Sequence, residues 1–197
     1  MSQSDADELV TTLGPVVVAF NRLKIPHYVG GSVASSYHGA VRSTMDIDLV
    51  CDMQEQQISE FLSQFSQDFY VSEIAVRQAV ARRACFNLID YRTSYKVDVF
   101  IMRGRPFDRA CMARAQRANL GSGDLSLSVP IATVEDTIIS KLEWYRLTDE
   151  TSDRQWDDVS RLVRLVGSKI DLEYLWSMAQ DVGVSNLLER LLGPGPR

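Results

Sequence analysis

Two aspartates separated by a single residue open an apolar run in the first quarter of the chain. Asp46 and Asp48 begin the segment Asp-Ile-Asp-Leu-Val-Cys, which ends at Cys51. Because side chains alternate along a strand, residues i and i+2 point to the same face. Two carboxylates on one face are costly to bury unless they are paired or bind a metal ion. Carboxylates together with phosphate oxygens are ligands that suit Mg²⁺. The pattern therefore predicts a divalent-cation site for a phosphate-bearing substrate.

A glycine-rich turn precedes this aspartate pair. Gly30, Gly31 and Ser32 follow a short apolar segment. Glycine adopts backbone torsions that are closed to other residues, and it lets a phosphate approach the main chain. Ser32 is predicted to cap a helix at residues 33–39, and the N–H groups at a helix N-terminus bind anions. Alone, the triplet would be an ordinary strand-to-helix turn. Placed before the aspartate pair, it predicts a phosphate-binding turn.

A third carboxylate lies further along the chain. Asp98 stands inside the otherwise apolar strand pattern of residues 95–101. A single carboxylate in such a strand is unfavourable unless it meets a cation. Asp98 is therefore a candidate third metal ligand, and also a candidate base for an attacking hydroxyl. The alternative is structural: Asp98 pairs with Lys96 or Arg42, and Asp46 caps a turn.

The ordered set of these motifs resembles the signature of the DNA polymerase β-like nucleotidyltransferase superfamily. In that superfamily the Gly-Ser turn holds the nucleotide triphosphate, and three aspartates bind two metal ions. The resemblance implies an NTP substrate and two Mg²⁺ (or Mn²⁺) ions, held here by Asp46, Asp48 and Asp98. Arg42 and Thr44 occupy the Arg-x-Thr positions before the aspartate pair. There the arginine contacts phosphate or orients the metal carboxylates, or forms a purely structural pair with them, and the threonine secures the loop.

A segment nearer the C-terminus resembles one branch of this superfamily. This branch contains small bacterial proteins related to the nucleotidyltransferase components of AbiEii-type abortive-infection and toxin–antitoxin systems. In those proteins a lysine from the first C-terminal helix and an Arg…Asp pair from the second lie near the nucleotide. Carried over, the candidates are Lys141, Arg154 and Asp158, with the adjacent Asp157 as an alternative match. Lys141 would bind the triphosphate or neutralise the leaving pyrophosphate. The alternative is an interhelical salt bridge that joins these residues and Glu143.

The composition is that of one globular unit. The chain has 197 residues, 45% of them hydrophobic, and a net charge of −5. No run reaches the roughly 18 apolar residues that a membrane span needs. The acidic N-terminus has no signal-peptide pattern, so we expect a cytoplasmic protein. The three cysteines are predicted to be buried free thiols: Cys51, Cys85 and Cys111.

The charge is unevenly distributed along the chain. Residues 71–120 contain ten Lys or Arg against four Asp or Glu, although the whole chain is acidic. Such a basic band attracts phosphates, or it is simply a solvated face. Trp144, Trp156 and Trp176 stand at helical spacing and are predicted to belong to the core rather than to stack on a base.

The apolar periodicity predicts the α+β class, with a nucleotidyltransferase-type mixed sheet flanked by helices and a C-terminal helical bundle. We expect an α/β core at residues 1–131 and a helical portion at 132–197 packed on it. Strands are expected at 27–29, 47–51, 69–71, 83–91 and 95–102, and a loop followed by an edge strand at 119–131. Helices are expected at 6–24, 33–39, 54–65, 73–80, 107–116, 133–147, 152–166, 171–182 and 184–192.

The function that these patterns favour is metal-dependent transfer of an NMP from an NTP to a hydroxyl. The acceptor is an RNA end, a protein or a small molecule; the basic band favours a phosphate-rich one, such as RNA. Two alternatives stay open. One is a toxin-type enzyme controlled by an antitoxin or other partner protein. The other is a catalytically idle nucleotide-binding protein of the same fold.

Overall fold

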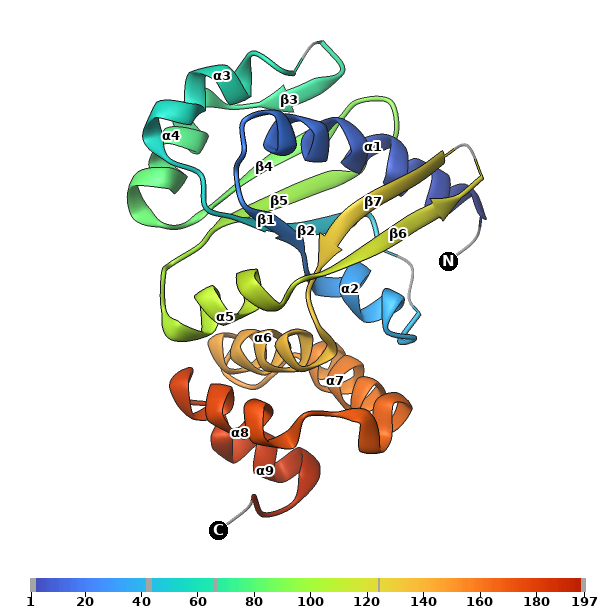
Figure 1. Cartoon of the computed structure of the whole chain (residues 1–197), viewed down its shortest axis with the longest axis vertical. Coiled ribbons are helices and arrows are strands. Elements are labelled where there is room, and N and C mark those ends of the chain that lie inside the picture. Colours follow the sequence, from blue (N-terminus) through green and yellow to red (C-terminus); the bar gives the residue numbers. More distant parts are fainter. Residues whose placement is uncertain (1–2, 42–43, 66, 124, 196–197) are drawn as a thin grey trace.

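The computed structural model describes residues 3–41, 44–65, 67–123 and 125–195. Within these ranges the strands form one mixed sheet with the order β3-β4-β5-β2-β1-β7-β6. The strands are β1 (His27–Val29), β2 (Asp46–Cys51), β3 (Phe69–Val71), β4 (Cys85–Asp90), β5 (Lys96–Ile101), β6 (Gln116–Ser122) and β7 (Leu125–Ile131). Helices lie on both sides of the sheet, and the C-terminal helices gather at one end (Figure 1). The predicted α+β class is confirmed.

The helices follow the predicted order, with shifted ends. They are α1 (Gln3–Arg22), α2 (Gly31–Tyr37), α3 (Ile58–Leu62), α4 (Glu73–Arg82), α5 (Pro106–Arg114), α6 (Val134–Leu147), α7 (Asp153–Val166), α8 (Leu172–Asp181) and α9 (Ser185–Leu192). The helix expected at 54–65 is shorter, because a 3-10 turn at Glu55–Gln57 precedes α3.

The centre of the sheet is formed by β2 and β5, which run parallel. Along both strands buried and partly exposed residues alternate, as expected for a sheet whose two faces differ. Ile47 and Leu49 are fully buried, and so are Val97 and Val99 beside them. The residues between them point to the opposite face. This register sets Asp48 directly beside Asp98, on the face that does not carry the apolar pairs.

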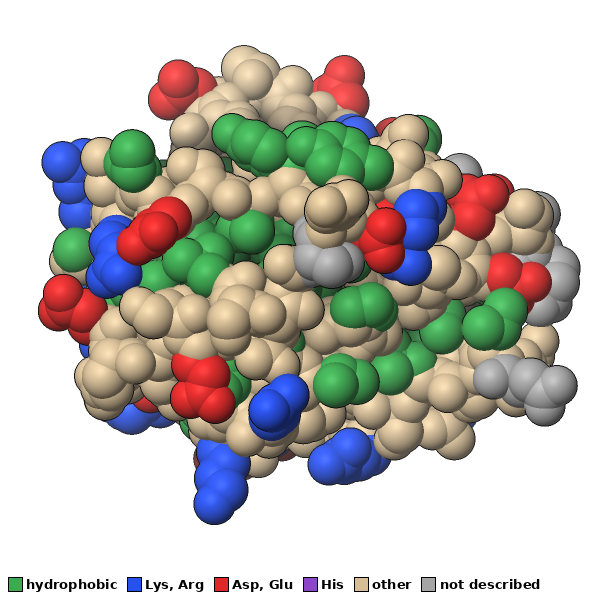
Figure 2. Space-filling view, turned by 90° about the horizontal axis from the view of Figure 1, so that it is seen from above, with side chains coloured by type: hydrophobic (Ala, Val, Ile, Leu, Met, Phe, Trp, Pro, Cys, Tyr) green, Lys and Arg blue, Asp and Glu red, His purple; other side chains and the backbone are tan. Residues whose placement is uncertain are grey.

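The apolar face of the sheet is covered by α1, α3 and α4 (Figure 1). Leu13, Val16 and Phe20 of α1 are fully buried, and the Phe20 ring stacks on Phe61 of α3 with centroids 5.2 Å apart. Each such buried side chain contributes about 1.5–3 kcal/mol. Viewed from this end of the molecule (Figure 2), charged side chains lie mainly around the rim, and hydrophobic side chains emerge between them in several groups.

The segment between α5 and α6 differs from the sequence prediction. A loop and an edge strand were expected at 119–131, but residues 116–131 form the hairpin of β6 and β7. Here β6 is the edge strand, and β7 lies inside the sheet next to β1. Gly121 and Gly123 have positive φ angles and stand at the end of this hairpin. The two glycines therefore mark the tight connection of two strands, not an extended loop.

After β7 the chain passes directly into the C-terminal helices. Thr133 caps α6, since its side-chain oxygen accepts a hydrogen bond from the Asp136 backbone N–H at 3.2 Å. At the end of α2, the His38 ring bonds through Nε2 to the Ala132 carbonyl oxygen at 2.8 Å, which ties α2 to the start of α6. The division of the chain after residue 131 stays a prediction. No helix within the described residues is both long enough and apolar enough to span a membrane.

Candidate active site

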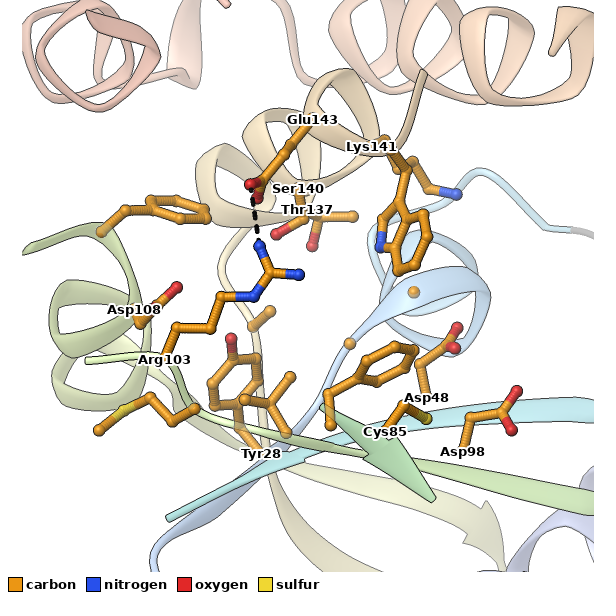
Figure 3. A pocket seen from close by; sticks show the side chains of 18 of the residues that line it. Tyr28, Asp48, Cys85, Asp98, Arg103, Asp108, Thr137, Ser140, Lys141 and Glu143 are labelled. Atoms are coloured by element: carbon orange, nitrogen blue, oxygen red, sulfur yellow. Dashed lines mark ion pairs between the residues drawn. The ribbon is translucent and has the colours of Figure 1, made fainter. Parts of the chain in front are cut away.

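A cleft of about 510 Å³ opens between the sheet and α6. Figure 3 shows Asp48, Asp98 and Lys141 toward one end of it, and Arg103, Asp108 and Glu143 toward the other. The residues that line it come from the central strands, from the turn before α2, from the segments around β4 and after β5, and from α6. They are Tyr28, Gly30, Gly31, Ser32, Asp48, Val50, Arg83, Ala84, Cys85, Asp98, Phe100, Ile101, Met102, Arg103, Arg105, Phe107, Asp108, Ala132, Thr137, Ser140, Lys141, Glu143, Trp144, Leu147 and Gln155.

The glycine turn is shaped around the Asp48 side chain. Gly31 has a φ of +54°, and a Cβ added there would lie 1.7 Å from Oδ2 of Asp48. The Gly30 N–H donates to the Asp48 carbonyl at 2.9 Å, and the Ser32 backbone N–H hydrogen-bonds to the Asp48 carboxylate. Glycine is required at position 31 because the carboxylate packs directly against the turn. The turn thus belongs to the same site as the aspartates.

The predicted role of Ser32 as a helix cap is wrong. Helix α2 begins at Gly31, and Gly30 is its N-cap residue without a side-chain hydrogen bond. Ser32 therefore lies inside the first turn, where its backbone N–H faces Asp48. The helix thus starts two residues earlier than the serine pattern indicated, with the positive φ of Gly31 at its first position.

The two carboxylates in the cleft affect each other. Burial, and next the negative charge of Asp98, raise the pKa of Asp48 to about 6, although Lys141 acts in the opposite direction. Like charges on neighbouring carboxylates disfavour the ionised form. Burial is therefore the main reason why Asp48 binds a proton more readily than a free carboxyl group, and the neighbouring Asp98 adds to it.

Asp98 also has a cationic neighbour on its own strand. The Lys96 ammonium lies 2.8 Å from Oδ2 of Asp98 and 3.4 Å from Oδ1 of Asp46. Asp46 stands opposite Lys96 in the strand register and is about half exposed, outside the residues that line the cleft. The alternative that Asp98 pairs with Lys96 is thus realised. The same contacts show that a positive charge fits between Asp46 and Asp98.

Lys141 approaches the cleft from α6. Its ammonium lies 2.8 Å from Oδ2 of Asp158 on α7, and both side chains are at least 90% buried. It also lies 3.4 Å from Oε1 of Gln155. Arg154 and Asp157 are exposed on α7. Of the predicted interhelical salt bridge, the structure shows the pair of Lys141 and Asp158.

Glu143 belongs to a different ion-pair group. Arg105 donates to Glu143 at 2.5 Å and to Asp108 at 2.8 Å, and Arg103 lies 3.7 Å from Glu143. The dashed line in Figure 3 marks the pair of Arg103 and Glu143. This group, which the sequence patterns did not indicate, forms the end of the cleft away from Asp48.

The loop before β2 is described only in part. Arg42 lies outside the described residues. Thr44 is buried, and its Oγ1 accepts a hydrogen bond from the Asp46 N–H at 3.2 Å. Thr44 therefore secures the start of β2 and does not line the cleft.

Two expectations about side-chain burial are wrong, and both concern the cleft. Cys85 was expected to be buried but is exposed, whereas Cys51 and Cys111 are buried. Trp144 was expected in the core but is 45% exposed. Both line the cleft, which a one-dimensional pattern does not reveal. Only the spacing of Trp144 from Lys141, three residues on one helix face, pointed to this site.

The donor set suits a divalent cation. Asp46, Asp48 and Asp98 offer hard carboxylate oxygens on one face of β2 and β5, the ligand type that Mg²⁺ and Mn²⁺ take. Burial and then the charge of Asp98 raise the pKa of Asp48, and an added cation would balance the contribution of Asp98. In the described part of the chain, no three His, Cys, Asp or Glu side chains are already arranged as a metal cluster.

The comparisons with known proteins define the type of fold. No family model matches the sequence, and no curated protein matches it. The structure is similar to that of an antigenic nucleotidyltransferase-like protein from Paracoccidioides brasiliensis, with a TM-score of 0.58 and 16% identity over 96% of this chain and 90% of that one. It is also similar to ANT(2″)-Ia in complex with adenylyl-2″-tobramycin, with a TM-score of 0.55 and 12% identity over 89% of this chain and 97% of that one. The chain therefore has a nucleotidyltransferase-type fold, as the sequence resemblance implied.

Proposed function

We propose that the protein is a metal-dependent nucleotidyltransferase that moves an NMP from an NTP to a hydroxyl group of an acceptor. The observation that carries this proposal is the side-by-side placement of Asp48 and Asp98 on parallel strands, in one cleft with the glycine turn and Lys141. The fold type supports it, because the similar structures are a nucleotidyltransferase-like protein and an enzyme bound to an adenylylated antibiotic.

In this proposal Asp46, Asp48 and Asp98 hold two Mg²⁺ or Mn²⁺ ions. When bound, such ions neutralise charge on the phosphoryl oxygens and lower the pKa of the attacking group. The Asp98 and Asp46 carboxylates both raise the pKa of Asp48, and such a grouping of carboxylates is consistent with metal binding. Lys96, which lies between Asp46 and Asp98, balances part of the charge before an ion binds.

The remaining residues position the reacting groups. Gly30, Gly31 and Ser32 form the turn that the phosphates approach at the start of α2, and its glycines leave the main chain open to them. Lys141, whose ammonium is held by Asp158, stabilises charge on the leaving pyrophosphate. Asp98 accepts the proton of the acceptor hydroxyl. The acceptor oxygen then forms a bond to the α-phosphorus, and the bond from that phosphorus to the pyrophosphate oxygen breaks.

Further site roles are part of the same proposal. We assign Arg42 and Thr44 to the loop that presents Asp46, and Arg154 and Asp158 to the nucleotide side of α7. The division into a core at 1–131 and a helical portion at 132–197 is retained, with the site formed by both. We place the protein in the cytoplasm, where NTPs are available.

The acceptor is an RNA end, a protein or a small molecule. The structural similarity to ANT(2″)-Ia in complex with adenylyl-2″-tobramycin supports a small-molecule hydroxyl. The sequence resemblance to AbiEii-type proteins supports a second candidate, a toxin-type nucleotidyltransferase that acts on RNA or protein and is held in check by an antitoxin.

Calorimetry with each of the four NTPs, in the presence of Mg²⁺ or Mn²⁺, tests this function. We expect metal-dependent binding of an NTP by the wild type and its loss in the Asp48→Asn variant. Asp157→Asn is the matched control, because Asp157 is exposed on α7 and does not line the cleft. Equal NTP binding by wild type and Asp48→Asn, or no NTP binding by the folded wild type, contradicts the proposal.

Expression in a bacterial host separates the toxin-type candidate from the others. Growth arrest that disappears with Asp46→Ala supports it. Unimpaired growth of a culture that produces the folded wild-type protein contradicts it.

A further inference from the structure

We propose that Trp144, supported by Phe100, is the surface on which the base of the bound NTP stacks. This inference rests on the proposed function and adds to it the place of the nucleobase. It concerns the part of the cleft next to the carboxylates. Trp144 and Phe100 line the cleft there, but the proposed metal and phosphate contacts give them no role.

The first observation is the exposure of Trp144. Its side chain is 45% exposed, although α6 packs against α2, α7 and α8. Trp156 and Trp176, by contrast, are partly buried against the core. A large aromatic side chain left open to solvent inside a concave site, rather than packed, is typical of a ligand-binding surface.

The second observation is where this surface lies relative to the charged groups. Trp144 follows Lys141 by three residues, so the two side chains lie on one face of α6. Phe100 follows Asp98 by two residues and lies on the same face of β5. The aromatic pair thus adjoins both the ammonium and a carboxylate of the site. In a nucleotide only the sugar separates the base from the α-phosphate, so a base surface must lie next to the phosphate site.

The third observation is the geometry of the pair. The rings of Phe100 and Trp144 lie edge to face, with centroids 5.8 Å apart and an angle of 67° between the planes. This contact fixes the indole, yet a single edge-to-face contact covers at most one of its two faces. Leu147, three residues further along α6, is 57% exposed and lines the same cleft. The indole therefore has apolar neighbours in the cleft, and almost half of its side-chain surface is open to a flat ring.

The chemistry of stacking explains why this surface needs few polar groups. Every nucleobase has a π-face, so stacking on an aromatic side chain tolerates any base. The surface accordingly supplies affinity, and by itself it does not choose among bases. The competing occupant of this surface is a ring that belongs to the acceptor. The test distinguishes the two, because it compares ATP, which carries a base, with tripolyphosphate, which does not.

The test compares two ligands that differ only in the nucleoside. Calorimetry measures the binding of ATP and of inorganic tripolyphosphate, each with Mg²⁺, to the wild type, Trp144→Ala and Trp144→Phe. We expect Trp144→Ala to weaken ATP binding about 5- to 150-fold, the range for loss of one base–aromatic stack. Tripolyphosphate affinity should change less than about twofold, and Trp144→Phe should retain much of the ATP affinity. Tyr91→Ala is the control, because Tyr91 is 62% exposed and lies outside the cleft.

The outcomes separate this inference from the proposed function. If the wild type binds ATP and Trp144→Ala binds it equally well, the base surface is refuted, the nucleotide site stands, and the aromatic pair is left for the acceptor. If Trp144→Ala loses ATP and tripolyphosphate to the same extent, Trp144 supports the phosphate site rather than the base, which also refutes the inference. If the wild type binds neither ligand, the proposed function and this inference both fail.

Discussion

Replacement of Gly31 by alanine tests the most demanding contact of the site. The new Cβ would lie 1.7, 2.5 and 2.8 Å from Oδ2, Cγ and Cβ of Asp48. Distances this short are incompatible with the present positions of both residues, so the Asp48 side chain or the strand that carries it must move. Alanine would also have to adopt a φ near +54°, which L-residues disfavour.

The two effects have separate magnitudes. A positive φ costs an alanine about 1–2 kcal/mol. Displacement of a packed neighbour costs about 1–3 kcal/mol more. Gly183 provides the matched control, since it has a φ of +76° and nothing within 4 Å of an added Cβ. Gly183→Ala should therefore lower the free energy of unfolding by about 1–2 kcal/mol, and Gly31→Ala by about 2–5 kcal/mol.

Urea denaturation of the wild type, Gly31→Ala, Asp48→Gly and the double variant measures how much of the Gly31→Ala destabilisation comes from the clash with Asp48. In an Asp48→Gly background all three clashing atoms are absent, so the cost of Gly31→Ala should fall to that of Gly183→Ala. The coupling between positions 31 and 48 would then be about 1–3 kcal/mol. Equal costs of Gly31→Ala and Gly183→Ala in the wild-type background would refute this reasoning. The reasoning would also be refuted if Gly31→Ala lowered the free energy of unfolding equally in the wild type and in the Asp48→Gly background.

Three further predictions concern charged and titrating groups. Lys141→Met should destabilise the protein by about 3–5 kcal/mol, because it removes the ammonium that pairs with the buried Asp158 carboxylate; urea denaturation should show that adding Asp158→Leu recovers most of this loss, and no recovery would count against the pair. Lys96→Met should enlarge the rise in melting temperature on addition of Mg²⁺, since the ammonium no longer neutralises Asp98; an unchanged rise in thermal-shift measurements would contradict this. Burial lowers the pKa of His27, so the histidine contributes stability above its unfolded-state pKa of about 6.5, and this is lost as pH falls through the folded-state pKa. His27→Phe should therefore lose less stability than the wild type between pH 7.5 and 5, and an equal loss in urea denaturation would exclude this role for His27.

The sequence predicted several short strands that are mostly apolar. Strand β1 at 27–29 and strand β3 at 69–71 have the predicted limits, and the aspartate strand begins one residue earlier than expected. A short apolar segment between turn residues is a local property, so it is visible without knowledge of the partner strands. The hairpin at 116–131 was missed, because its outer strand is exposed along most of its length and lacks an apolar period.

For the candidate site too, the sequence predicted local spacing but not contacts between distant residues. The spacing of Asp46 and Asp48 predicted a shared face, and the parallel register that brings Asp98 beside Asp48 agrees with it. The reason for Gly31 was not predictable, since it lies in a contact with a side chain that is 17 residues away in the sequence. Trp144 was assigned to the core because helical spacing alone does not distinguish a buried face from one that lines a cleft.

Helix α6 connects the stability of the C-terminal helices to the state of the carboxylates. Its Lys141 lowers the pKa of Asp48 and is itself held in place by the buried Asp158 on α7. Loss of Lys141 would thus change the site in two ways, by removing the ammonium from the buried Asp158 carboxylate and by removing a cation that favours ionised Asp48. The packing of α6 against α7 is therefore part of the electrostatics of the cleft, because Lys141 comes from one helix and its partner Asp158 from the other.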